Sequence, residues 1–181
     1  VKQFAKLYRD NKSDFPIGTD TTDYERSLKD TFPIHPSLFQ YLYNKWGAIE
    51  GFQRTRGVLR FVGEVVHHLW NGNDNSLMIM PGSIYLSESD VQDELIKYIG
   101  MNWISIIAED VEGNESIAYN IDKNDTRLGK NSISRRIARA IFMATAPSIG
   151  SQNLGVDDKE ILRSSIQPGE NLIIFRDALN Q

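Results

Sequence analysis

The chain contains no cysteine, which excludes disulfide bonds and thiolate metal sites. It also lacks any run of the roughly 18 apolar residues that a membrane-spanning helix needs, so we expect no membrane partner. The opening residues, VKQFAKLYRD, have the pattern of an amphipathic helix rather than of a signal peptide. Together these absences favour a cytoplasmic protein.

A strong charge of either sign is also missing, because the 181 residues carry a net charge of −4. This balance argues against a broadly basic coat for nucleic acid, although a local basic patch is still compatible with it. The first residue is not methionine, and the last residues, FRDALNQ, stop inside a helical pattern. We therefore expect a fragment of a longer protein.

Recognisable catalytic patterns are absent as well. Gly129-Lys130 lacks the upstream glycine and the following hydroxyl residue of a phosphate-binding loop. His67 and His68 are adjacent, so on a helix they diverge by about 100° and cannot chelate one metal ion together. His35 precedes a proline and is expected to help start a helix. No serine or threonine has a base at a recognisable spacing, so the chain alone is expected to be non-catalytic and to hold no metal.

Apolar residues at helical spacing indicate a mainly α fold. At most one short β element is expected in this α fold, at 76–86. Loops are predicted at 112–116 and 122–129. Three regions follow: a helical lid-like region at 1–72, a connecting region at 73–130, and a region resembling a helix-turn-helix or the start of a winged helix at 131–181. Helices are predicted at 1–10, 20–30, 36–46, 51–71, 89–99, 103–111 and 132–147, with two more in the tail.

Two of these helices have a clear buried face in the sequence. The face of the 51–71 helix consists of Val58, Val62, Val65, Val66 and Leu69, and that of the 132–147 helix of Ile133, Ile137, Ile141 and Ala144. In the tail, Asp157 and Glu160 fit a capping box, and Pro168-Gly169 is predicted to turn the chain between two helices.

The opposite side of the 51–71 helix is polar. Arg56 and Arg60 are four residues apart, and arginine presents a planar donor fork that suits phosphate oxygens. Gly57 and Gly63 would let another backbone or a ligand approach closely. The alternative is a solvated face with an ion pair between Arg60 and Glu64, which would add only a few tenths of a kcal/mol.

A second basic cluster, Arg135, Arg136 and Arg139, lies at the start of the 132–147 helix. These arginines could pair with Asp122 or Asp125 just upstream, or bind a phosphate, a nucleic acid or a partner protein. The final helix has Arg176 as its one basic residue, which favours protein–protein packing over DNA reading by the tail.

The linked phrases FPIHPSLFQYLYNKWGAIEGFQRTRGVLRFVGEVVHHLW and RIARAIFMATAPS resemble a family of large predicted AAA+ ATPases, domain-of-unknown-function family 499, downstream of its nucleotide-binding core. Members often accompany DNA-modification or phage-defence systems. The resemblance implies a helical lid whose arginine senses the γ-phosphate, with Arg60 as the leading candidate and Arg56 in reserve. It also implies ATP and Mg²⁺ for the parent protein, and a core in the same chain as partner.

Two hypotheses of different classes follow. In the first, the chain is a non-catalytic lid and sensor part of an ATP-driven machine. In the second, it is a non-catalytic adaptor that binds protein or DNA through Arg135, Arg136 and Arg139. The Walker elements of an ATPase are not in this chain, so it cannot hydrolyse nucleotide by itself.

Overall fold

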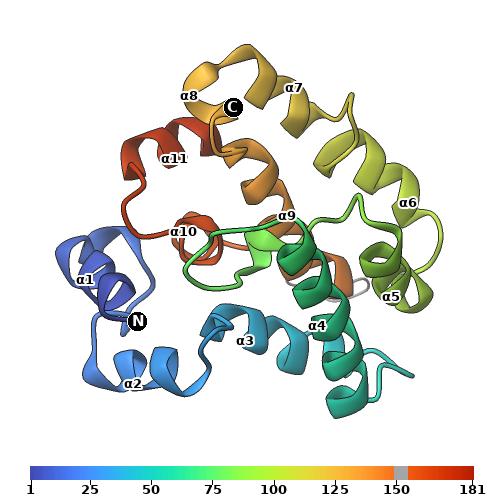
Figure 1. Cartoon of the computed structure of the whole chain (residues 1–181), viewed down its shortest axis with the longest axis horizontal. Helices are drawn as coiled ribbons and strands as arrows, with labels where there is room; N and C mark the ends of the chain where they lie inside the picture. The colour runs from blue at the N-terminus through green and yellow to red at the C-terminus, as the bar shows by residue number, and fades with distance from the viewer. Residues whose placement is uncertain (149–154) are drawn as a thin grey trace.

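The computed structural model describes residues 1–148 and 155–181, which contain eleven α-helices and no strand (Figure 1). The predicted mainly α fold is confirmed. The β element proposed for 76–86 is reduced to one isolated parallel bridge between Ile34 and Ile79. The helices are α1 (Lys2–Asp10), α2 (Thr22–Asp30), α3 (Pro36–Asn44), α4 (Arg54–Asn71), α5 (Ser89–Ile99), α6 (Trp103–Ile106), α7 (Ile117–Asn124), α8 (Thr126–Gly129), α9 (Ile133–Thr145), α10 (Asp158–Ser165) and α11 (Leu172–Leu179).

Shorter helical turns connect several of these helices. A π-helical segment, η4 (Ile107–Val111), continues α6, so the helix predicted at 103–111 is present. The other short turns are 3-10 helices: η1 (Lys12–Asp14), η2 (Trp46–Ala48), η3 (Pro81–Ser83) and η5 (Ala146–Ser148).

Polar side chains at the predicted boundaries cap the helices. Asp157 accepts a hydrogen bond from the backbone N–H of Glu160 at the start of α10, which confirms one half of the predicted capping box. The carboxylate of Glu160 does not complete the box, because it accepts hydrogen bonds from Tyr41 and Arg163 instead. His35 caps α3 through its ring Nδ1, which accepts from the N–H of Ser37 at 3.2 Å, so its predicted role is confirmed.

The prediction of a loop at 122–129 is wrong. Residues 117–124 form α7 and residues 126–129 form α8, with a single residue, Asp125, between them. Asp125 caps α8 by accepting from the N–H of Arg127 at 2.9 Å, and fully buried Leu128 anchors the short helix in the core. The run of Asp and Asn residues therefore marks a junction between two helices.

Two residues assigned to buried faces are exposed. Val66 of α4 and Ile141 of α9 point outward, while the other apolar residues of those faces are buried or half-buried. Phe61, which was not assigned to the α4 face, is buried and fills the position opposite Gly63 on the helix.

Helix α9 packs against the largest number of neighbours, and the other elements surround it (Figure 1). Its first half contributes Ile133 and Ile137 to an apolar cluster with α1, α2, α10 and α11. Its second half contributes Phe142 and Met143 to another cluster with α3, α4 and α5. Helices α1 and α2 thus share a core with α10 and α11, far away in the sequence. The division into three regions stays a prediction.

Candidate functional site

The long helix α4 buries one face and exposes the other. Val58, Phe61, Val65 and Leu69 are buried in the cluster shared with α3 and α5. Arg56 and Arg60 lie on the exposed side, as the helical spacing predicted. The helix holds these two guanidinium groups about one turn apart on one surface.

Arg60 and Arg56 have different surroundings. Arg60 donates a hydrogen bond of 2.7 Å to the carboxylate of Glu94 on α5, and its side chain is 60 % exposed. The alternative of a solvated face paired Arg60 with Glu64, and that pairing is wrong, because the acid lies on the neighbouring helix α5. Arg56 is exposed and makes no ion pair or side-chain hydrogen bond with the described residues.

The two glycines of α4 serve different purposes. A Cβ atom on Gly57 would lie 2.0 Å from the carbonyl oxygen of Phe52, because the chain doubles back just before the helix. Gly57 is therefore required by the domain's own packing. A Cβ atom on Gly63 would have nothing within 4 Å, so nothing in the described structure requires glycine there.

The arginines at the start of α9 are occupied by acids from other elements. Arg135 donates to the carboxylate of Asp122 on α7 at 3.0 Å, which is one of the two partners suggested by the sequence. The same carboxylate accepts from the backbone N–H of Ser134 at 2.9 Å. Asp122 thereby caps α9, whose own N-cap residue, Ser132, makes no side-chain cap.

Arg136 and Arg139 connect α9 to two further segments. Arg136 donates to Glu170 at 2.6 Å, just beyond the Pro168-Gly169 turn. Arg139 is only 2 % exposed, and its guanidinium donates to both carboxylate oxygens of Glu112. The group also stacks over the ring of Tyr85, 4.1 Å from its centroid. Arg139 is thus not accessible to a nucleic acid in this structure.

The acids that hold these arginines were not found in the sequence. Glu112 lies 27 residues before Arg139, and Glu170 lies 34 residues after Arg136. Periodicity within one helix gives no signal for partners at such separations, which only the packed structure brings together.

A cleft of about 320 Å³ lies beside Arg136 and Arg139, between η3, the 74–77 segment and the turn after α10. Gln167 lines it and donates to the carbonyl oxygen of Met78 at 2.9 Å, while its own side-chain oxygen has no hydrogen-bond partner. Both arginines are already paired, so among its described residues the cleft offers the buried, unpartnered side-chain oxygen of Gln167 but no free cation.

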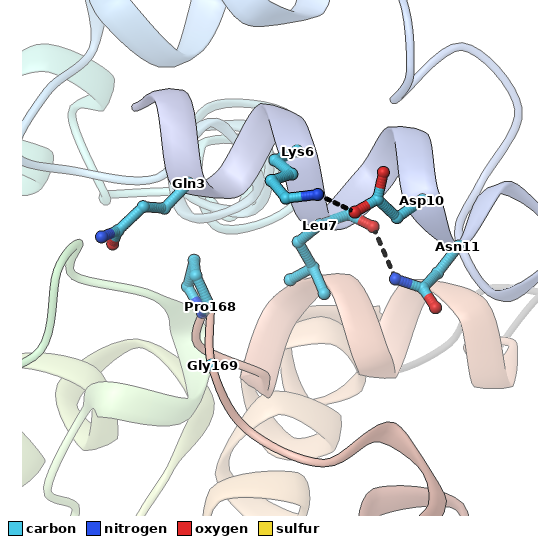
Figure 2. A pocket seen from close by; sticks show the side chains of 7 residues that line it. All are labelled: Gln3, Lys6, Leu7, Asp10, Asn11, Pro168 and Gly169. Carbon is cyan, nitrogen blue, oxygen red and sulfur yellow. Dashed lines mark hydrogen bonds and ion pairs between the residues drawn. The ribbon is translucent and has the colours of Figure 1, made fainter.

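A second pocket, of about 340 Å³, lies between α1 and the turn that precedes α11 (Figure 2). Lys6 and Asp10 on its wall pair with each other at 2.5 Å, and Asn11 donates to the carbonyl oxygen of Leu7 at 2.9 Å. Lys6, Asp10 and Asn11 are thus engaged with their own helix, and the side chain of Gln3 lies apart from them (Figure 2), so the polar groups do not converge on a common point.

A buried polar network lies between α1, α2, α3 and α10. The hydroxyl of Tyr8 and ring Nε2 of His35 are 2.8 Å apart, and both side chains are fully buried. Burial lowers the pKa of His35 well below its usual range, with a smaller contribution from the charge of Arg163. Burial likewise raises the pKa of Tyr24 to about 12. The network contains a neutral histidine and neutral tyrosines near pH 7.

No cluster of three or more His, Cys, Asp or Glu side chains suited to a metal occurs among the described residues. His67 contacts Asn71 at 3.0 Å, whereas His68 lies 3.3 Å from Glu88, so the two rings of this pair have separate partners. In the described part of the chain, no helix has both the length and the apolar character to cross a membrane.

A family model described as the DUF499 second domain matches residues 2–171, nearly the whole chain. This chain belongs to the DUF499 family. The resemblance predicted from the 32–70 and 136–148 phrases is thereby supported at the level of the family. No curated protein and no solved structure matches the DUF499 domain described here.

Proposed function

We propose that this DUF499 domain is a non-catalytic helical module of a larger AAA+ ATPase, in which α4 presents arginines to ATP and Mg²⁺ held by a nucleotide-binding core. The supporting observation is the exposed pair Arg56 and Arg60, four residues apart on a helix that is otherwise anchored in the core. The resemblance to AAA+ lids gives Arg60 the role of sensor for the γ-phosphate. A DNA-modification or phage-defence system is the proposed setting.

The ion pair of Arg60 is compatible with such a role. The side chain of Arg60 is 60 % exposed, and the less exposed Glu94 would keep its second ion pair, with Lys97, if Arg60 turned to a phosphate. Arg56 needs no displacement, because it has no charged partner among the described residues. The adaptor hypothesis has less support, because Arg135, Arg136 and Arg139 are all engaged in ion pairs inside the domain.

The test is the ATPase rate of the full-length protein that carries this domain. Arg60→Ala should lower the rate at least about tenfold, as the loss of one preorganised donor to a reacting phosphate does. Arg9→Ala is the matched control, because Arg9 is also a half-exposed arginine with one carboxylate partner, Glu25 at 2.8 Å, and it should leave the rate unchanged. A rate for Arg60→Ala within about twofold of wild type would rule out the sensor role.

A further inference from the structure

The carboxylate of Glu94 on α5 is shared between two cations. Its oxygen Oε1 accepts a hydrogen bond of 2.7 Å from Arg60 of α4, and its oxygen Oε2 accepts from Lys97, one turn further along α5. Helix α5 packs beside α4 (Figure 1), so the first of these ion pairs crosses from one helix to the other. The arginine on the exposed side of α4 is thus held by a carboxylate of the domain itself.

Glu94 and Arg60 differ in how freely they can move. The side chain of Glu94 is 13 % exposed, whereas that of Arg60 is 60 % exposed. A long side chain that lies mostly in solvent can change rotamer without unpacking its neighbours. If Arg60 turned away, the carboxylate would keep Lys97 as its partner and would not become an unpaired charge at a partly buried position. Arg60 is therefore the member of the pair that can leave.

A carboxylate and a phosphate compete for the same guanidinium donors. The hydrogen bond to Glu94 comes from Nη2 of Arg60. A phosphate group accepts two parallel hydrogen bonds from the arginine fork and carries more negative charge than a carboxylate, so it is the stronger partner. The pair with Glu94 therefore has to be broken by any phosphate that binds Arg60, and it lowers the apparent affinity for that phosphate.

We propose that Glu94 is a positioning residue of the nucleotide site, which holds Arg60 until a γ-phosphate takes its place. The role of Glu94 rests on the proposed function, to which it adds an internal competitor for the sensor arginine. Removing the competitor should tighten the binding of a nucleoside triphosphate, because Arg60 is then always available. A nucleoside diphosphate has no γ-phosphate to meet Arg60, so its affinity should not change.

The test is a calorimetric titration of the full-length protein, with Mg²⁺, against adenylyl imidodiphosphate, a non-hydrolysable triphosphate, and against ADP. Glu94→Gln removes the charge that holds Arg60 and keeps the shape of the side chain. Its dissociation constant for the triphosphate should fall about three- to fivefold, the factor that corresponds to the loss of one partly exposed ion pair. Its dissociation constant for ADP should equal that of the wild type.

Two further variants separate the contact from the charge. Glu94→Asp keeps the negative charge but shortens the side chain by one methylene group, so it should release Arg60 and tighten the triphosphate as well. In an Arg60→Ala background, Glu94→Gln should have no effect, since the guanidinium that Glu94 holds is gone. Glu94→Asp also provides the measurement if Glu94→Gln does not fold.

Glu25→Gln is the matched control, because Glu25 accepts from Arg9 at 2.8 Å and the substitution removes the same charge from another ion pair. It should leave both affinities unchanged. If both Glu94 variants bound the triphosphate like the wild type while Arg60→Ala lowered the ATPase rate, the role of Glu94 would be refuted and the proposed function would stand. Equal tightening of ADP and the triphosphate would indicate a general charge effect and would also refute it. A wild-type ATPase rate for Arg60→Ala would instead refute the proposed function, and the role of Glu94 with it.

Discussion

Arg60 and Arg139 have the same side chain in very different surroundings. Arg139 is buried with Glu112, and separating a buried pair leaves an uncompensated charge at a cost of about 3–5 kcal/mol. Arg60 is largely exposed, and its partner Glu94 is also paired with Lys97, so exchanging Glu94 for another anion would not leave a buried charge without a partner. The two arginines can therefore be assigned opposite tasks: Arg139 holds α9 in place, whereas Arg60 is available to a ligand.

His35 makes the stability of the domain depend on pH. Its pKa in the folded state lies well below the value of about 6.5 that it has in an unfolded chain, so the unfolded chain binds the proton more readily. The contribution of neutral His35 to the stability of the folded domain is therefore fully present above about pH 6.5, and it is lost as the pH falls below that value. We expect the free energy of unfolding to decrease by up to about 1.4 kcal/mol per pH unit below pH 6.5.

Urea unfolding at pH 7.5, 6.5 and 5.5 measures this effect, with His35→Gln as the comparison. The variant lacks the titrating ring, so its stability should depend less steeply on pH over the same interval. Other groups around the ring, Tyr8, Tyr24 and Arg163, keep their protonation state there. Equal slopes for the two proteins would show that His35 is not the group responsible.

At the scale of one helix, the two glycines of α4 can be compared by substituting each with alanine and measuring the change in stability. Gly63→Ala should stabilise the domain by about 0.5–1 kcal/mol, because alanine is the better helix former and its methyl group meets no atom. Gly57→Ala should destabilise it, because the methyl group would lie against the carbonyl oxygen of Phe52. Thermal unfolding of both variants, followed by circular dichroism, measures the two shifts. If both substitutions moved the midpoint in the same direction, the distinction between a required and an open glycine would be wrong.

The helices themselves could largely be predicted from the sequence, because the apolar periodicity of 36–46, 51–71 and 132–147 is strong and turn residues bound these segments. The interval 122–129 could not, because Asp and Asn favour caps and turns equally. Asp125 acts as a cap there only because buried Leu128 holds the following turn in the core. The candidate site shows the same division between local pattern and tertiary packing. The helical spacing predicts that Arg60 is exposed, but its partner on α5 depends on how two helices pack.

At the scale of the whole molecule, α9 joins the two apolar clusters. Its first half lies in the cluster of α1, α2, α10 and α11, and its second half in that of α3, α4 and α5. Tyr41 on α3 also donates to Glu160 on α10 at 3.0 Å, which ties the clusters together a second time. Since a rigid helix crosses from one cluster to the other, neither cluster should lose its packing without the other.

Phe175→Ala tests this coupling. Phe175 is fully buried on α11, and its loss should cost about 3–5 kcal/mol. Trp46 is fully buried in the other cluster, where it donates to the carbonyl oxygen of Met143 at 3.0 Å, so tryptophan fluorescence reports on that cluster. In urea, the fluorescence and circular dichroism midpoints should both fall and should coincide, as in a two-state transition.

Ile173→Ala on the same helix is the control, because Ile173 is exposed and its loss should change stability by no more than about 0.5 kcal/mol. If Phe175→Ala lowered the circular dichroism midpoint while the fluorescence midpoint stayed unchanged, the clusters would unfold as separate units. In that case one cluster could move relative to the other in the proposed ATP-driven protein. With coincident midpoints, the two clusters unfold as one cooperative unit, and a response to the proposed nucleotide is then best explained by a rigid-body displacement of the whole domain.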